Sequence, residues 1–504
     1  MTETVPQAAA KPSALALFAG HPRGLKLLFF TELWERFSYY GMRALLVLYL
    51  TKRLGFQDAE AYALYGAYTA LVYIGPVLGG VLADRILGPR RAVGFGGLLI
   101  AAGHFTLALS HLGGGGGAVF YLALALIIAG EAFFKVNIST LVGKLYEPGD
   151  PRRDAGFTLF YMGINLGAFA ATVLCGWLGE SYGWHYGFGL AGIGMLIGLT
   201  VFFTGIRNLG PIGEAPDLAR LFRPLFGAVS VEAAIYLGGF VVIGAGLVLI
   251  QRPETVGALL GLVGGAGAIG LLVYALTVLA GEARERLLVV LALALFTIIF
   301  WALFEQAGSS LTLFADRNVE RHVFGFDIQA SQLQFLNPLF ILLLAPFFSW
   351  LWPHLERRGR SITTPEKFAL GLALLGAGFA VLVVASAYSA QAGRVGLVWL
   401  ALAYLLHTAG ELCLSPIGLS MVTKLSPRQS VGAVMGVWFL AMAAGQFLAG
   451  KFAGLASGPA EAGTAKGLLA FAGLFGILAL IAFGAALFLV ALKEVLHRRM
   501  HGAD

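Results

Sequence analysis

The sequence has few charged side chains and almost no cysteine. Asp, Glu, Lys and Arg make up only 12% of its 504 residues, about half the fraction of a typical soluble domain. Hydrophobic residues make up 58%, and the mean hydropathy is +0.82. Cys175 and Cys413 are the two cysteines, and both lie in apolar segments, so we expect buried thiols and no disulfide. Long apolar runs with so little charge exclude a soluble domain and indicate a polytopic helical membrane protein.

The sequence also lacks the motifs on which other classes of membrane protein depend. It has no HExxH or GxSxG motif for an enzyme and no repeated filter segment for an ion channel. The alternating pattern of a membrane β-barrel is absent as well. His104 and His407 are isolated and fit packing roles better than metal binding. We therefore expect no catalytic residue, metal or cofactor, and the +7 charge, spread over loops, does not indicate nucleic-acid binding.

About 14 hydrophobic spans follow one another along the chain. They group as six, two and six. We expect an all-α fold of two six-helix bundles with an inserted two-helix hairpin, and a flexible outer turn at 113–117. The predicted parts are a tail at 1–24, a first bundle at 25–206, linkers and the hairpin (225–280) at 207–286, a second bundle at 287–495 and a tail at 496–504.

The distribution of basic residues predicts the orientation. With the N-terminus inside, cytoplasmic segments carry roughly 23 Lys and Arg and external loops about 8. Both termini are therefore predicted to be cytoplasmic.

The span at 30–51 carries charges that are costly at membrane depth. At 100° per residue, Glu32, Glu35, Arg36 and Arg43 fall on one side of a helix, and that side cannot face lipid. One interpretation is a self-neutralising pair that only joins helices. The other is a polar pathway lined by this helix.

Charged residues in other spans lie at matched depths. At 1.5 Å per residue, Arg43 and Glu305 lie at one level, and Lys135 and Glu411 at a second level nearer the cytoplasm. The first bundle thus presents bases and the second presents acids. Pairs that form across a cleft and open in turn would provide the two gates of alternating access.

Two motifs resemble those of the proton-dependent oligopeptide transporters of the major facilitator superfamily. Residues 32–41 (ELWERFSYYG) match the ExxERFxYYG signature, and residues 160–169 (FYMGINLGAF) are similar to the FYxxINxG signature. The segment around Asp84 and Arg85 resembles the inner-loop motif of the superfamily, and Lys135 fits the family's fourth helix. The resemblance covers the whole chain and implies the major facilitator fold.

The resemblance also implies roles for individual residues. Those implied in proton coupling are Glu32, Glu35, Arg36 and Glu305. Those implied in substrate binding are Arg36, Tyr40, Arg43, Tyr73, Lys135, Asn165, Trp301, Asn337, Glu411 and Trp438. The gating salt bridges would be Arg43 with Glu305 and Lys135 with Glu411.

The chain departs from the family pattern at a few positions. Ala168 stands where serine is common, and Ala441 and Met442 stand where some relatives have a small hydroxyl residue. The histidine of animal members near the second span is absent, which leaves protonation to carboxylates.

These observations predict a proton:peptide symporter that imports di- and tripeptides, and peptide-like drugs, across the bilayer. A dipeptide has opposite charges roughly 5–6 Å apart, which suits a basic half facing an acidic half. We expect it to act as a monomer driven by the proton gradient. The alternatives are a membrane enzyme, an ion channel, or the same scaffold with nitrate or a drug-like amine as substrate.

Overall fold

The computed structural model describes residues 17–110, 117–147, 149–323, 325–391, 393–456 and 464–502. Most of the predicted N-terminal tail and most of the predicted turn at 113–117 lie outside the described residues.

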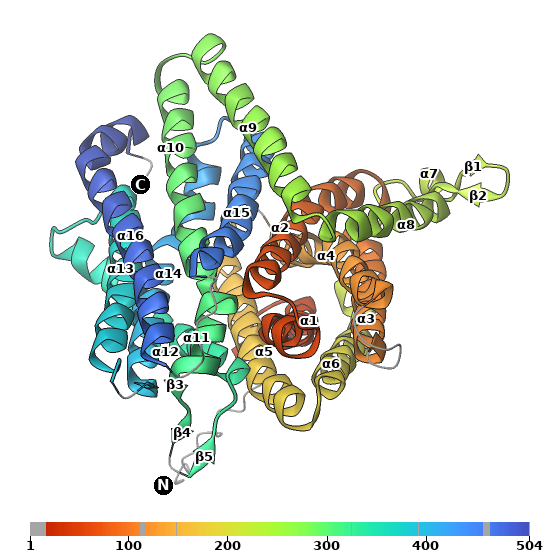
Figure 1. The fold of residues 1–504 in the computed structure, drawn as a ribbon. Helices are drawn as coiled ribbons and strands as arrows, with labels where there is room; N and C mark the ends of the chain where they lie inside the picture. Colours follow the sequence, from red (N-terminus) through yellow and green to blue (C-terminus); the bar gives the residue numbers. More distant parts are fainter. Residues whose placement is uncertain are drawn as a thin grey trace, which may run out of the picture.

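The described chain is almost entirely helical (Figure 1). The first bundle contains α1 (Arg23–Leu48), α2 (Asp58–Leu82), α3 (Pro89–Leu109), α4 (Ala118–Lys144), α5 (Arg153–Tyr182) and α6 (Trp184–Gly205). The insertion contains α7 (Leu218–Phe222), β1 (Pro224–Phe226), β2 (Val229–Ser230), α8 (Val231–Ile250) and α9 (Pro253–Thr277). The second bundle contains α10 (Gly281–Phe304), α11 (Ser310–Asn318), α12 (Leu336–Arg357), α13 (Thr364–Tyr388), α14 (Leu397–Leu425), α15 (Val431–Ala453) and α16 (Ala465–Met500).

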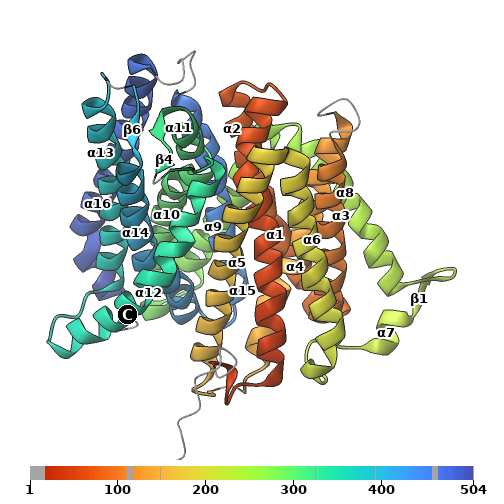
Figure 2. The ribbon, with the colours of Figure 1, turned by 90° about the horizontal axis from the view of Figure 1, so that it is seen from below.

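Thirteen helical segments among the described residues are long and apolar enough to cross a membrane, with α10 and α11 counted as one. Helix α1 is not among them because of its charged residues, although it is 26 residues long. These thirteen and α1 make the fourteen helices that the sequence predicts. The described chain begins and ends at the same end of the bundles (Figure 2). We name this end, which is predicted to be cytoplasmic, the inner end.

Helix α1 lies inside a ring formed by the other helices of the first bundle (Figure 1). Its main packing partners are α5 and α6. A Cβ atom on Gly167 of α5 would lie 2.2 Å from the carbonyl oxygen of Leu33, so only glycine permits this approach of the two backbones. The charged face of α1 is accordingly buried in protein: Glu35 is fully buried and Arg36 is 4% exposed. The prediction that this face avoids lipid is confirmed.

The two bundles repeat the same packing pattern. In the first, α1 packs on α5 and α6, α2 on α4, and α3 on α4 and α6. In the second, α10 packs on α15 and α16, α12 on α14, and α13 on α14 and α16. The bundles meet where α2 packs on α15 and where α5 packs on α12. Because α2 and α12, and α5 and α15, are the corresponding helices, the two interfaces are equivalent under a twofold relation, as in transporters built from parallel repeats.

The inserted hairpin lies outside both bundles and contacts each of them. Helix α8 packs on α4, and α9 packs on α15. Glu232 pairs with Arg91 of the first bundle at 3.0 Å, and Glu254 pairs with Lys451 of the second at 2.5 Å. The prediction of a helix from residue 225 is wrong, since β1 and β2 form a small antiparallel hairpin there and α8 begins at Val231. This β-hairpin projects to the side near the inner end (Figure 2).

Two other segments differ from their predicted spans. The ninth span, predicted at 287–315, is broken by a 3₁₀ segment, Glu305–Gly308, between α10 and α11. The last helix continues to Met500, so much of the predicted tail at 496–504 is helical. The remaining strands are short. β3 (Val319–Glu320) pairs in parallel with β6 (Val395–Gly396), and β4 (His322–Val323) pairs with β5 (Phe326–Asp327).

Candidate functional site

A cluster of buried charges joins α1 to α4. Arg36 contacts the Glu35 carboxylate directly, and its Nε lies 3.1 Å from Glu32 Oε1. Its Nη2 lies 3.5 Å from Oε2 of Glu131 on α4. None of these four residues is more than 4% exposed. A role for Glu131 could not be predicted, because a single glutamate within an apolar span gives no sign of its partner.

Lys135 lies one turn along α4 from Glu131 and faces aromatic rings. Its Nζ lies 3.5 Å from the centroid of the Tyr73 ring and 5.6 Å from that of Tyr39. Within the described chain, Nζ has no hydrogen-bond partner. A cation over a ring face keeps part of its electrostatic stabilisation, but all three ammonium donors stay open to another acceptor.

The cluster as a whole is neither neutral nor fully hydrogen-bonded. Glu32, Glu35 and Glu131 outnumber the two cations, Arg36 and Lys135, by one charge when all are ionised. One oxygen of each carboxylate is buried without a hydrogen-bond partner among the described residues. Buried polar atoms in proteins are nearly always paired. This site can therefore accept a proton, water or a polar ligand.

A second ion pair joins the two bundles. Arg43 of α1 contacts the Glu305 carboxylate through Nη2 and donates from Nε to Tyr65 Oη at 2.6 Å. Gln446 Nε2 of α15 donates to the other Glu305 oxygen at 2.8 Å. The contact expected from the matched depths of Arg43 and Glu305 is therefore present, and Tyr65 and Gln446 complete it.

The break after α10 provides the space for this pair. Gly308 ends the 3₁₀ segment, and a Cβ atom there would lie 1.8 Å from Tyr65 Oη. The glycine thus leaves room for the phenol that binds Arg43. Gln306 holds the break in place, since its Nε2 donates to the Ala302 and Ala449 carbonyl oxygens at 3.0 Å each.

A third polar group lies on the second bundle. Asn337 Nδ2 of α12 donates to Glu411 Oε2 at 2.9 Å and to Thr408 Oγ1 at 3.1 Å, both on α14. Glu411 is 8% exposed. No ion pair between Lys135 and Glu411 is present among the described residues, so the predicted inner pair is not formed in this conformation.

The other predicted site residues lie on four different helices. Tyr40 lies beneath Arg43, with 5.6 Å between the guanidinium carbon and the ring centroid. Asn165 of α5 donates to its own helix, at the Tyr161 carbonyl oxygen. Trp301 packs on Gly445 and Trp438 packs on Gly418, and both indoles are buried.

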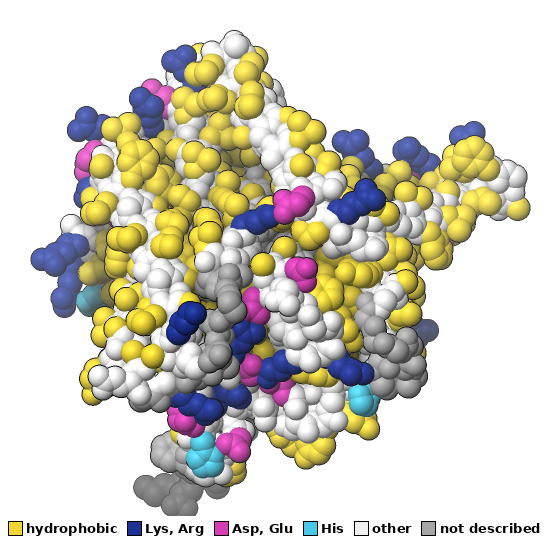
Figure 3. Space-filling view, viewed as in Figure 1, with side chains coloured by type: hydrophobic (Ala, Val, Ile, Leu, Met, Phe, Trp, Pro, Cys, Tyr) yellow, Lys and Arg dark blue, Asp and Glu magenta, His cyan; other side chains and the backbone are white. Residues whose placement is uncertain are grey.

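Ion pairs between the bundles also form at the outer end, and the sequence analysis missed them. Both terminal nitrogens of Arg317 on α11 bind the Asp58 carboxylate of α2, at 2.6 and 2.8 Å. Lys52 binds Asp316 at 2.6 Å. Figure 3 views this end, where charged side chains of both signs lie between the bundles and hydrophobic side chains cover their flanks. These residues lie at helix ends, where charged side chains are common, so nothing in the sequence marks them as partners.

Close backbone contact completes the outer closure. A Cβ atom on Gly450 of α15 would lie 2.3 Å from the Tyr62 carbonyl oxygen of α2, and one on Gly66 would lie 2.9 Å from the Phe447 carbonyl oxygen. Nearby, Ser331 donates from its backbone N and its hydroxyl to Glu180 of α5, at 2.8 and 2.6 Å. The outer ends of the bundles are thus held together by hydrogen bonds and tight packing.

The segment after α2 joins helices of one bundle at the inner end. Asp84 lies 3.5 Å from Lys144 of α4, and Arg90 Nε donates to the Ile212 carbonyl oxygen at 2.5 Å. Among the described residues no group of His, Cys, Asp and Glu could hold a metal ion.

Comparison with known proteins identifies the family of this chain. A family model described as the POT family matches residues 90–469. The chain belongs to the POT family. It therefore has the major facilitator fold that its motifs implied, and it is a membrane transporter rather than an enzyme.

Several relatives match nearly the whole POT chain. An uncharacterized transporter YclF of Bacillus subtilis is 40% identical over 502 residues, 96% of each chain. The peptide transporter YePEPT of Yersinia enterocolitica is 39% identical and covers 87% of this chain and 88% of its own. A dipeptide and tripeptide permease A of Erwinia pyrifoliae is 38% identical over 89% of each.

Solved structures of POT proteins share the fold. A crystal structure of a peptide transporter POT mutant with alafosfalin has 40% identity and a TM-score of 0.82, and covers 96% of this chain and 97% of its own. A POT family transporter with 5-aminolevulinic acid has 30% identity and a TM-score of 0.81, with coverage of 95% and 98%.

Proposed function

We propose that the protein is a proton-coupled symporter that imports di- and tripeptides across the bacterial inner membrane by alternating access. Relatives that match nearly the whole chain are named as peptide transporters and permeases. Peptide-like drugs would be further substrates, and a structural relative is described with alafosfalin. We also propose that both termini are cytoplasmic, that a monomer suffices, and that the proton gradient replaces any cofactor.

The observation that carries this proposal is that the buried Lys135 ammonium has no acceptor among the described residues. A buried ammonium without an acceptor is costly, yet Lys135 Nζ has no hydrogen-bond partner in the described chain. Its predicted counterpart, Glu411, accepts a hydrogen bond from the neutral Asn337 amide, and no cation pairs with it among the described residues. A peptide carboxylate would satisfy Lys135, with Arg36 and Arg43 nearby on α1, and the peptide ammonium would satisfy Glu411 and Asn337.

The charge balance of the α1–α4 cluster supports proton coupling. Glu32, Glu35 and Glu131 exceed the cations Arg36 and Lys135 by one negative charge. Burying an uncompensated charge costs several kcal/mol, so one carboxylate would bind a proton when no other cation is present. When a peptide carboxylate engages Lys135, the cluster loses a counter-charge and its affinity for a proton increases. Proton and peptide binding would therefore favour each other.

Alternating access would use the contacts between the bundles. The Arg43–Glu305 pair and the outer contacts at Arg317 and Lys52 would keep the outer side closed. Protonation of Glu305 would remove the charge that binds Arg43 and so favour outer opening. The Lys135–Glu411 pair would form on the inner side in the opposite state. Tyr40, Tyr73, Trp301 and Trp438 would line side-chain pockets, and Asn165 would add a polar contact.

Counterflow in proteoliposomes tests the substrate assignment. Liposomes loaded with an unlabelled dipeptide should accumulate labelled dipeptide without a proton gradient, and an inward gradient should drive net uptake. Nitrate and a drug-like amine, which each lack one of the two charges, should not compete. Competition by either one as strong as by dialanine would contradict the zwitterion assignment.

A further inference from the structure

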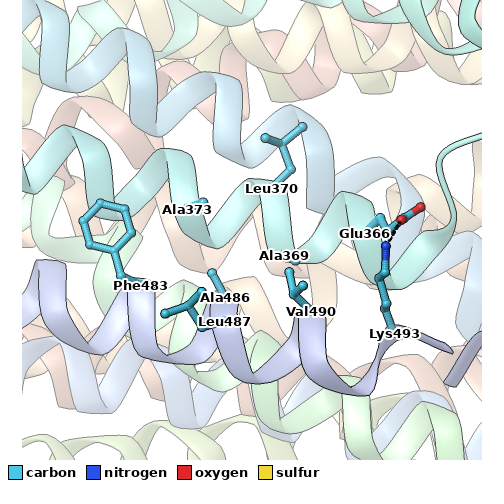
Figure 4. A pocket seen from close by; sticks show the side chains of 9 residues that line it. All are labelled: Glu366, Ala369, Leu370, Ala373, Phe483, Ala486, Leu487, Val490 and Lys493. Atoms are coloured by element: carbon cyan, nitrogen blue, oxygen red, sulfur yellow. Dashed lines mark hydrogen bonds and ion pairs between the residues drawn. The ribbon is translucent and has the colours of Figure 1, made fainter. Parts of the chain in front are cut away.

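A groove of about 460 Å³ runs between α13 and α16 on the second bundle (Figure 4). The small side chains of Ala369, Ala373 and Ala486 line it, and larger apolar side chains lie along its edges. The Glu366–Lys493 ion pair, with 2.7 Å between Oε1 and Nζ, lies at its inner end. None of these residues belongs to the site described above.

The helices close the groove at both ends. Toward the membrane centre, a Cβ atom on Gly376 would lie 3.1 Å from the Ala482 side chain, so α13 and α16 touch there. At the inner end the ion pair bridges them. From Phe483 to Lys493 the rise along α16 is about 15 Å, which equals the thickness of one hydrocarbon leaflet, roughly half of 30 Å.

Aromatic residues place the ion pair at headgroup level. Lys367, which follows Glu366, lies over Trp352 of α12, with 5.3 Å between Nζ and the ring centroid. Trp350, on the same helix, is 52% exposed. Tryptophan gathers where acyl chains meet headgroups. The groove therefore faces acyl chains, and Glu366 and Lys493 face headgroups.

The ion pair is partly exposed, and the other Glu366 oxygen, Oε2, accepts from the backbone N and the hydroxyl of Thr363, at 3.0 and 3.1 Å. The Lys493 side chain is 35% exposed and that of Glu366 is 31% exposed. Within the described chain, Glu366 is the acceptor that Lys493 contacts, so two ammonium donors stay available. Because the pair has no net charge, it would attract an anionic lipid headgroup only weakly. A headgroup with a quaternary amine has no N–H to donate to the Glu366 carboxylate.

We propose that this groove binds a phospholipid of the inner leaflet that carries a primary-amine headgroup. One acyl chain lies along the alanine-lined groove, the phosphate accepts from Lys493, and the ammonium donates to Glu366. The site depends on the orientation of the helices in the bilayer and not on which substrate the transporter carries.

Native mass spectrometry of the purified full-length protein tests this proposal. Phosphatidylethanolamine, phosphatidylcholine and phosphatidylglycerol with matched acyl chains are titrated in detergent. We expect one phosphatidylethanolamine per chain to bind at least tenfold more tightly than the other two, because only its headgroup carries an ammonium that donates a charge-assisted hydrogen bond to a carboxylate. Equal affinities for the wild-type protein would overturn the headgroup assignment without the need for any variant.

Variants locate the site. Glu366→Gln and Lys493→Gln should each weaken phosphatidylethanolamine binding about ten- to a hundredfold, the effect of losing a hydrogen bond to a charged group. Glu494→Gln and Lys466→Gln are matched controls on α16, exposed and outside the groove, and should bind as wild type. Ala373→Phe should fill the groove and abolish the preference. Wild-type binding by both ion-pair variants would place the lipid elsewhere.

Discussion

Replacing Lys135 with alanine should abolish uphill peptide uptake while leaving the fold nearly unchanged. The side chain makes no hydrogen bond in the described chain, and its main described contact is with the Tyr73 ring. Such a contact contributes on the order of 0.5–2 kcal/mol, and relief from burying an ammonium offsets part of that loss. Thermal unfolding should therefore change little.

The loss in binding free energy for the peptide should be much larger than the change in stability. A charged pair in a desolvated site is worth about 2–5 kcal/mol when one partner is removed. At 1.4 kcal/mol per tenfold, this predicts peptide affinity lower by about thirtyfold to several thousandfold. No acceptor among the described residues competes with the peptide for this ammonium, so the upper part of this range is expected.

The assay is peptide binding by calorimetry beside proton-driven uptake in liposomes. Lys144→Ala is the matched control, since Lys144 lies on the same helix but is half exposed and paired with Asp84 at the inner end. It should bind and transport as wild type. Accumulation by Lys135→Ala at the wild-type level under the same proton gradient would refute the assignment of Lys135 to the substrate carboxylate.

Three further predictions concern coupling, outer closure and the hairpin. Glu35→Gln and Glu305→Gln should each stop proton-driven accumulation of peptide. Counterflow should survive in at least one of these variants, because the amide resembles a protonated acid. Accumulation of peptide by both variants under a proton gradient would show that other residues couple the proton. Arg317→Ala should favour outer opening by breaking the bidentate pair with Asp58, measured as increased labelling of an outer cysteine, and unchanged labelling would show that this pair does not hold the closure. Deleting 225–280, with a flexible linker in its place, should leave uptake per folded molecule largely intact. The two paired acids of the hairpin, Glu232 and Glu254, lie near the ends of its helices and outside the α1–α4 cluster. A folded but inactive protein would show that the hairpin takes part in transport.

Much of the fold followed from hydrophobicity and charge. The fourteen helices could be predicted because a helix must satisfy its own backbone in lipid and needs about 20 apolar residues to cross it. The errors occurred where this rule does not apply. Residues 225–230 are largely apolar but precede α8, which begins at Val231. The ninth span breaks at Glu305–Gly308 because the Arg43–Glu305 pair and Tyr65 need room there, and the pattern of one helix cannot show such a need.

The candidate site was predicted only in part. Charges at membrane depth identified Arg43, Lys135, Glu305 and Glu411, since such residues are too costly to face lipid. Their partners were not predictable beyond a matching depth. Glu131 joins the cluster through the packing of α4 on α1, and no spacing along the chain relates it to Arg36.

The sequence by itself determined that the chain is a polytopic helical membrane protein of this transporter family, because both depend on composition and on motifs within single helices. The tertiary structure decided which charges meet: it paired Arg43 with Glu305, left Lys135 without an acceptor among the described residues, and closed the outer end at Gly66 and Gly450. It also showed the repeated packing of the two bundles. Helices form from local hydrogen bonds and hydrophobicity, whereas contacts between residues hundreds of positions apart depend on how whole helices pack.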